Sequence, residues 1–139
     1  MKIAVVDGQG GGIGKIITEK IRQEFGDLIE IIALGTNALA TSQMLRAGAN
    51  DGASGENAIV LNVHKVEIII GSVAILAANS MLGELTPNIA KAIGESSAHK
   101  LLLPINRCNI DIVGVVAEPL PHQIEQLIEK LKKIVLNPK

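Results

Sequence analysis

The hydrophobic positions along the chain follow two alternating patterns. Short apolar runs rich in β-branched residues, typical of buried parallel strands, occupy residues 2–6, 28–34, 67–70 and 100–103. Longer stretches with an apolar residue every three or four positions, typical of helices with one buried face, occupy residues 13–25, 38–47, 57–63, 87–94 and 121–135. The chain is therefore expected to alternate between strands and helices.

This alternation favours βαβ units and a parallel sheet covered by helices on both faces. We expect a single domain, residues 1–139, with a three-layer Rossmann-like α/β fold and a mostly parallel sheet of four to five strands. Residues 50–56 are small and polar, and we expect a loop there. Residues 110–116 are apolar and β-branched, which predicts a fifth strand.

Residues 73–78 would be apolar on every side if they formed a helix. A small domain has limited room to bury such a segment, so we expect a homodimer formed through it. The alternative is that the segment is a crossover buried within one subunit.

Composition excludes several classes of function. The net charge is −1, and the aromatic side chains amount to one phenylalanine. Nucleic-acid binding uses an excess of Lys and Arg to neutralise phosphates, or aromatic side chains on which bases stack. We therefore expect no nucleic-acid partner. A chain without tyrosine also cannot use a tyrosine acid or base.

No metal or membrane contact is expected. Cys108 is the single cysteine, which excludes a Cys-based zinc site, and the three histidines lack metal-ligand spacing. The first apolar run ends at Asp7 after four residues, too short for a signal peptide. The most apolar stretch, residues 68–82, is interrupted by polar residues and is shorter than a membrane span. We therefore expect a cytoplasmic protein.

A glycine-rich segment lies between the first predicted strand and the first predicted helix, and it reads Asp7-Gly8-Gln9-Gly10-Gly11-Gly12-Ile13-Gly14-Lys15. Glycines let backbone N–H groups approach an anion, and the helix N-terminus adds its dipole. The spacing fails G-x-G-x-x-G and the Walker pattern, but it resembles the G-x-x-x-G-[IL]-G loop of short-chain dehydrogenases. We expect a phosphate or nucleotide site; the alternative is a tight turn without a ligand.

Dehydrogenase chemistry is not expected. A short-chain dehydrogenase needs a Tyr-x-x-x-Lys pair, and this chain has no tyrosine. The second predicted strand is followed by Gly35-Thr36-Asn37, without the acid that holds an NAD ribose. The cofactor therefore stays open, with a nucleotide or dinucleotide as the candidates, and no catalytic residue is assigned.

Polar residues also follow the other predicted strands, at the edge where parallel sheets bind ligands. Arg107 could pair with a phosphate or a carboxylate. We expect Cys108 to be a small buried residue rather than a nucleophile, and Glu84 to be an exposed loop carboxylate rather than a general base. Asp7 either contacts magnesium or ribose or bonds the amides of its own turn. The predicted site comprises Asp7, Gly8, Gln9, Gly10, Gly11, Gly12, Gly14, Lys15, Thr36, Asn37, Asn106 and Arg107.

These residues favour binding of a small phosphorylated ligand, either a nucleotide or a phosphometabolite, in a protein that could also be an enzyme. The alternative is a non-catalytic oligomeric sensor or scaffold that uses the same site. Measurement of turnover separates the two hypotheses.

Four motifs together resemble an uncharacterised bacterial family, a domain of unknown function. They are DGQGGGIG at residues 7–14, LGTNALAT at 34–41, ANSMLGE at 78–84 and NRCN at 106–109. This resemblance implies an identity without an activity. Residues 35–37 are also similar to the Gly-Thr-Thr segment of the methylglyoxal-synthase-like fold, which implies a phosphate contact there. The catalytic aspartates of that enzyme have no clear counterpart in this chain.

Overall fold

The structure, a computed structural model, describes residues 1–137. It contains five strands, which are β1 (Lys2–Asp7), β2 (Glu30–Gly35), β3 (Asp51–Ser54), β4 (Ile68–Ser72) and β5 (His99–Leu103). Five α-helices connect or follow them, namely α1 (Gly12–Phe25), α2 (Ala38–Arg46), α3 (Glu56–Asn62), α4 (Pro87–Glu95) and α5 (Leu120–Leu136). Three short 3₁₀ turns are η1 (Gly26–Leu28), η2 (Val73–Leu76) and η3 (Met81–Gly83).

The five strands form one fully parallel sheet in the order β3-β2-β1-β4-β5. The central strand β1 pairs with β2 from Lys2 to Asp7, and with β4 on its other side. The chain first builds outward from β1 to β3 and then returns to add β4 next to β1. This reversal of strand order creates a crevice at the carboxyl ends of β1 and β4, where ligands bind in open α/β sheets.

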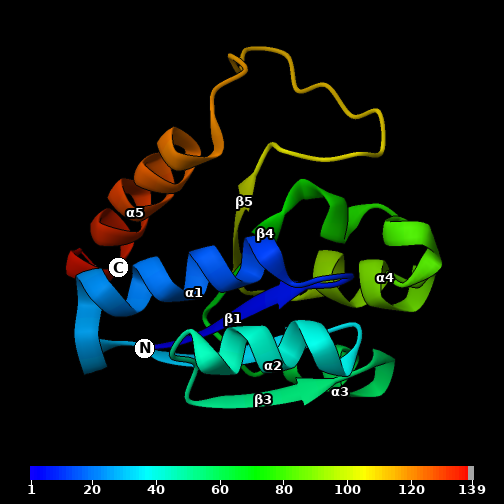
Figure 1. Cartoon of the computed structure of the whole chain (residues 1–139), viewed down its shortest axis with the longest axis horizontal. Helices are drawn as coiled ribbons and strands as arrows, with labels where there is room; N and C mark the ends of the chain where they lie inside the picture. Colours follow the sequence, from blue (N-terminus) through cyan, green and yellow to red (C-terminus); the bar gives the residue numbers. More distant parts are fainter. Residues whose placement is uncertain (138–139) are drawn as a thin grey trace.

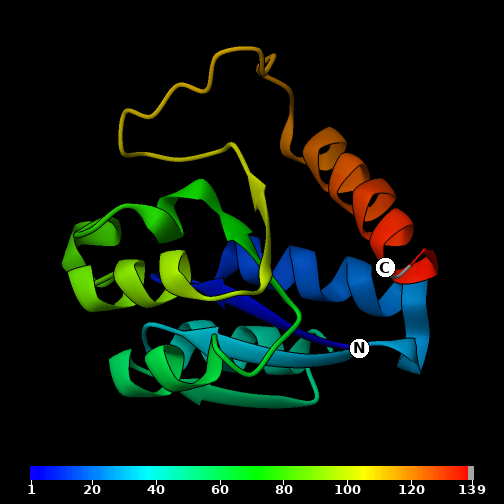
Figure 2. The same cartoon turned by 180° about the vertical axis from the view of Figure 1, so that it is seen from behind.

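Helices cover both faces of the sheet, which gives three layers (Figures 1 and 2). Side chains alternate between the faces along β1, with Ile3 and Val5 in one core cluster and Ala4 and Val6 in the other. The first cluster is completed by α1, α2 and α5, and the second by α3, α4 and η2. The predicted three-layer α/β fold with a parallel sheet is confirmed.

Two of the predicted elements are wrong. Residues 51–54 form the edge strand β3, paired with β2 from Ile32↔Asp51 to Gly35↔Ser54, where we expected a loop. Its small polar residues have a low propensity for strands. The segment is extended because it pairs with the backbone of β2 through the hydrogen bonds of the sheet. Residues 110–116 form no strand, and the side chains of Val113 and Val116 are 100% and 76% exposed. Their β-propensity finds no partner strand, because β5 pairs only with β4.

The apolar segment 73–78 is a crossover that is buried only in part, because Leu76 and Ala78 are exposed. It forms the short turn η2, in which Ala74 and Ile75 are buried within the subunit's own core. The Ser72 hydroxyl caps this turn by accepting the N–H of Ala74 at 3.1 Å. Ile75 is therefore unavailable to a second subunit, and homodimerisation stays a prediction without an assigned interface.

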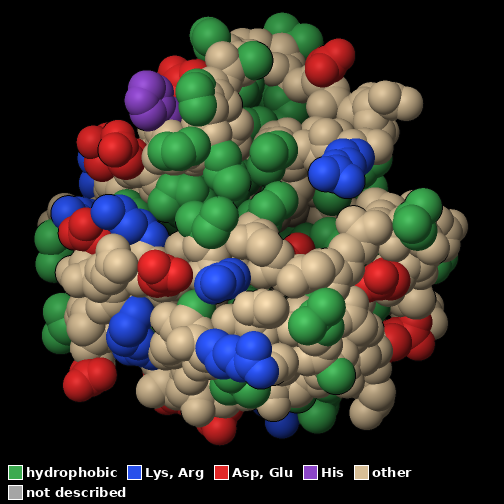
Figure 3. Space-filling view, in the orientation of Figure 1, with side chains coloured by type: hydrophobic (Ala, Val, Ile, Leu, Met, Phe, Trp, Pro, Cys, Tyr) green, Lys and Arg blue, Asp and Glu red, His purple; other side chains and the backbone are tan. Residues whose placement is uncertain are grey.

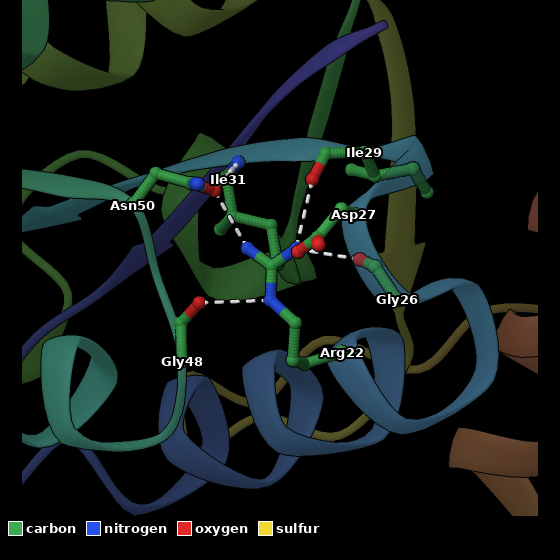
Figure 4. Close-up of polar contacts among 7 residues, drawn as sticks. All are labelled: Arg22, Gly26, Asp27, Ile29, Ile31, Gly48 and Asn50. Atoms are coloured by element: carbon green, nitrogen blue, oxygen red, sulfur yellow. Dashed lines mark hydrogen bonds and ion pairs between the residues drawn. The ribbon is translucent and has the colours of Figure 1, made fainter.

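A part-buried cluster of hydrogen bonds closes the amino end of the sheet around Arg22, near the C-terminus of α1 (Figure 4). Its guanidinium donates from Nε to the Gly48 carbonyl at 2.9 Å, and from Nη1 to the carbonyls of Gly26 and Ile29 at 2.6 and 3.0 Å. Nη2 donates to Asn50 Oδ1 at 2.6 Å, and that oxygen also accepts the N–H of Ile31. We call these residues the Arg22 cluster.

Beyond β5 the chain crosses residues 104–119 before α5 packs against α1 and β5. Hydrophobic side chains gather between α5 and this segment (Figure 3).

Within the described residues, no helix combines the length and the apolar character needed to cross a membrane.

Candidate functional site

A cleft of about 930 Å³ opens at the carboxyl end of the sheet, where the strand order reverses. The loops after β1, β4 and β5 line it. Its lining residues are Asp7, Gly8, Gln9, Gly10, Gly11, Gly12, Ile13, Ser72, Ala74, Asn79, Ser80, Met81, Leu82, Ile105, Asn106, Arg107 and Cys108.

The glycine-rich loop contains backbone N–H groups without an acceptor among the described residues, on residues that line this cleft. Gly11 adopts a left-handed conformation with φ of 73°, and its N–H donates to the Gly8 carbonyl at 2.9 Å. The N–H groups of Gly8, Gln9 and Gly14 are taken by carboxylates. The N–H groups of Gly10, Gly12 and Ile13 have no acceptor within residues 1–137, and all three residues line the cleft.

The Asp7 carboxylate holds the glycine-rich loop in shape by accepting two of its backbone N–H groups. Its Oδ1 accepts the N–H of Gly8 at 2.8 Å, and its Oδ2 accepts the N–H of Gly14 at 2.6 Å. Burial raises the pKa of the Asp7 carboxyl, the two N–H bonds oppose that shift, and the charge of Glu84 adds to it. A Cβ at residue 14 would lie 2.7 Å from Met44 Sδ and 2.9 Å from Asp7 Cβ, so glycine allows α1 to approach β1.

Glu84 joins three loops above the sheet. Its Oε1 accepts the N–H of Gln9 at 2.8 Å, the Thr36 hydroxyl at 2.7 Å and Asn37 Nδ2 at 2.8 Å. These hydrogen bonds, led by the one from Thr36, lower the pKa of Glu84. We call this arrangement the Glu84 bridge. The expectation of an exposed loop carboxylate is wrong, because Glu84 is half-buried and binds residues far away in sequence.

The side chains of Thr36 and Asn37 form hydrogen bonds with other residues of the protein. Asn37 caps α2 by accepting the N–H of Ala40 with Oδ1 at 2.9 Å, and its Nδ2 also donates to the Gln9 carbonyl at 3.0 Å. Thr36 donates to Glu84. Both residues lie at the carboxyl end of β2, outside the set that lines the cleft.

The segment after β5 places Arg107 and Cys108 in the cleft. Asn106 holds this turn with four hydrogen bonds. Its Nδ2 donates to the carbonyls of Pro104 and Ile110, both at 2.9 Å, and its Oδ1 accepts the N–H groups of Cys108 and Ile110, both at 3.1 Å. The guanidinium of Arg107 is exposed and has no acceptor within the described part of the chain.

Strained backbone is concentrated at the cleft. Five non-glycine residues have positive φ, between 49° and 66°, and each such residue costs about 1–3 kcal/mol. Four of them line the cleft, and the fifth, Asn109, follows Cys108 directly. The four are Gln9, Asn79, Met81 and Leu82. Strain held in place at one location is typical of functional sites.

Of the residues that we assigned to the site, eight line the cleft, and they are Asp7, Gly8, Gln9, Gly10, Gly11, Gly12, Asn106 and Arg107. The other four lie elsewhere: Gly14 is buried beneath the loop, Lys15 is exposed on α1, and Thr36 and Asn37 belong to the Glu84 bridge. The site assigned from the sequence did not include the wall formed after β4, where Asn79, Ser80, Met81 and Leu82 lie. Among residues 1–137, no three His, Cys, Asp or Glu side chains are grouped to hold a metal ion.

Comparison with solved structures gave a match described as a universal stress protein in complex with cAMP. The two chains are 20% identical with a TM-score of 0.38, over 71% of this chain and 94% of that one. No curated protein matches the sequence. The sequence does match the family described as Domain of unknown function (DUF3842) over residues 2–136. The chain therefore belongs to this family, a domain of unknown function as we expected.

Proposed function

We propose that this protein binds a phosphorylated small molecule, a nucleotide or a phosphometabolite, whose phosphate is held by the N–H groups of Gly10, Gly12 and Ile13. One observation carries the proposal: these three donors lack an acceptor within residues 1–137 and line the same cleft. The first N–H groups of a helix have no partner in the helix, and the helix dipole makes them favourable donors to an anion. The volume of about 930 Å³ suits a small molecule.

The neighbouring acids leave these donors free for a ligand. Asp7 and Glu84 take the N–H groups of Gly8, Gln9 and Gly14, and none of the three remaining ones. The two carboxylates therefore shape the loop without filling the position where a phosphate would bind.

The proposal covers both an enzyme and a non-catalytic sensor. Two cleft residues could take part in chemistry, namely Asp7, whose pKa is raised by burial, and Cys108. Binding with turnover of the ligand supports an enzyme, and binding without turnover supports a sensor.

An NMR titration tests the proposal. The chain has no tryptophan or tyrosine for fluorescence, whereas a protein of 14.6 kDa gives resolved amide spectra. Millimolar inorganic phosphate and AMP are added to ¹⁵N-labelled protein. We expect saturable shifts of the Gly10, Gly12 and Ile13 amides. The absence of saturable shifts at these amides with either probe contradicts the proposal.

A matched pair of variants at Gly12 sharpens the test. Gly12 is the first residue of α1, so Gly12→Pro removes one donor without removing a helical hydrogen bond. Because a following proline disfavours the ψ of 15° at Gly11, unchanged amide shifts of Gly8 and Gly14 are required as evidence that the loop keeps its shape. Gly12→Ala keeps the donor, and its Cβ meets nothing within 4 Å. We expect Gly12→Pro to weaken binding about tenfold, as one charge-assisted hydrogen bond is worth, and Gly12→Ala to have little effect. Helical circular dichroism checks that both variants fold.

A further inference from the structure

The cleft is closed toward β2. The inference about the ligand's direction rests on the proposed function, because it takes the phosphate to be bound at the glycine-rich loop. A Cβ at Gly8 would meet Thr36 Oγ1, and it would lie 2.7 Å from Met81 Sδ and 3.3 Å from Glu84 Oε1. The Glu84 bridge and Met81 therefore fill the space above the carboxyl ends of β1 and β2. A dinucleotide in this fold places a ribose at the end of β2, and that position is occupied here by the protein.

The cleft is open toward β4 and β5. Ser72 at the end of β4, and Ile105 to Cys108 after β5, line that side. The four hydrogen bonds of Asn106 fix the turn that carries Arg107. The cleft therefore gives a ligand whose phosphate lies on the glycine-rich loop room to extend past β4 toward Arg107.

Arg107 is the charged group available to such a ligand. Among the residues that line the cleft, Asp7 and Arg107 are the charged ones, and both oxygens of Asp7 already accept backbone N–H groups. The guanidinium has no acceptor within residues 1–137. A guanidinium binds carboxylates and phosphates through two parallel hydrogen bonds, and it prefers them to neutral groups.

We propose that Arg107 is a specificity-determining residue that selects ligands with a second anionic group, a carboxylate or a second phosphate, besides the phosphate held by Gly10, Gly12 and Ile13. The ligand crosses from β1 over β4 to β5. The substrate class is then a compact metabolite with two anionic ends, and dinucleotides such as NAD⁺ are excluded.

Two matched pairs of probes test this selection. Glycerol 3-phosphate and 3-phosphoglycerate differ by a carboxylate, and fructose 6-phosphate and fructose 1,6-bisphosphate differ by a phosphate. Affinities are read from the amide shifts of Gly10, Gly12 and Ile13. We expect the doubly anionic member of at least one pair to bind about tenfold more tightly, as a charge-assisted bidentate contact allows. The pair that shows the gain identifies the second group.

Two arginine variants locate the effect. Arg107→Ala should remove the gain, so that the doubly anionic probe loses about tenfold in affinity and the singly anionic probe loses much less. Arg46→Ala removes the same charge from an exposed position at the far end of α2, and it should keep the gain.

Three results overturn the inference while the proposed function stands. They are equal binding of both members of each pair, an equal loss for both members in Arg107→Ala, and saturable shifts of Thr36 and Asn37 with NAD⁺. A complete absence of saturable shifts with all probes overturns the proposed function itself, and the inference with it.

Discussion

The two ends of the sheet are each organised around one charged side chain. At the amino end, Arg22 donates to the carbonyls of Gly26 and Gly48, which follow α1 and α2. At the carboxyl end, Glu84 accepts from Gln9 and Asn37, which precede the same two helices. A cation thus lies at the two helix C-termini and an anion at the two N-termini, as the helix dipoles favour.

The two ends differ in what they leave unpaired. The Arg22 cluster satisfies the loop carbonyls around it with donors from the protein. The Glu84 bridge satisfies one N–H of the glycine-rich loop, and three N–H groups on cleft-lining residues of the loop have no acceptor within residues 1–137. The comparison indicates that the hydrogen-bonding groups of the amino end are used for stability, whereas part of those at the carboxyl end stay unpaired in the described part of the chain, as the proposed ligand binding requires.

The largest effect is expected at the amino end. Arg22→Ala removes the donor of four hydrogen bonds and leaves the part-buried carbonyls of Gly48 and Ile29 without a donor, while the other two acceptors are exposed to water. We expect the free energy of unfolding to fall by about 2–4 kcal/mol. Urea denaturation followed by far-UV circular dichroism measures this change. Arg46→Ala, an exposed arginine, should change stability by less than about 0.5 kcal/mol. Equal effects of the two variants would remove the distinction between the two ends.

Gly8→Ala should disturb the carboxyl end by overpacking. The added Cβ meets Thr36 Oγ1 and Met81 Sδ, both within the closed side of the cleft. We expect a loss of about 1–3 kcal/mol, since these side chains must move. Gly10→Ala is the control, because its Cβ meets nothing within 4 Å. If Gly8→Ala is as stable as Gly10→Ala in thermal denaturation, the β2 side of the cleft is not closed.

Removal of the bridge itself should cost less than removal of Arg22. Glu84→Ala deletes the acceptor of three hydrogen bonds, but the half-buried donors can turn to water, so we expect about 1–2 kcal/mol. The local effect should be larger, with faster amide hydrogen exchange at Gln9 and in residues 79–85. Glu129→Ala, on the exposed face of α5, is the control. Unchanged exchange at these residues would show that the bridge does not hold the loop.

The smallest effect is a dependence on pH. The pKa of Glu84 is lowered in the folded protein, so its contribution to stability is fully present above about pH 4.3, the ordinary pKa of a glutamate. That contribution is lost as the pH falls through the lowered folded-state pKa. The difference in unfolding free energy between the wild type and Glu84→Gln should therefore shrink below about pH 4.3. A constant difference across this range contradicts an ionised bridge.

Local patterns predicted most of the fold. A buried parallel strand such as β4 is a continuous apolar run, Ile68-Ile69-Ile70, and the glycine-rich loop lies between a strand and a helix in direct succession. Strand β3 could not be predicted in this way, because its residues are small and its partner β2 supplies the ladder.

The long-range contacts could not be predicted from local patterns. Gln9 and Glu84 are 75 residues apart, and Arg22 and Asn50 are 28 residues apart. Thr36 and Asn37 were assigned to the ligand site because they follow a strand. In the fold, both side chains instead donate hydrogen bonds to Glu84. The sequence therefore predicts which edge of the sheet holds polar groups, and the tertiary fold decides which of those groups stay free.

The position of β1 between β2 and β4 has a consequence for the nascent chain on the ribosome. Residues 2–54 carry β1, β2 and β3, but the second neighbour of β1 begins only at Ile68. At roughly 5–20 residues per second, translation leaves one edge of β1 open for about 2–7 seconds after β2 is complete. During that interval the glycine-rich loop exists without the walls contributed by β4 and β5. The cleft is thus assembled late in synthesis, and an incomplete chain lacks Arg107 and the wall around it.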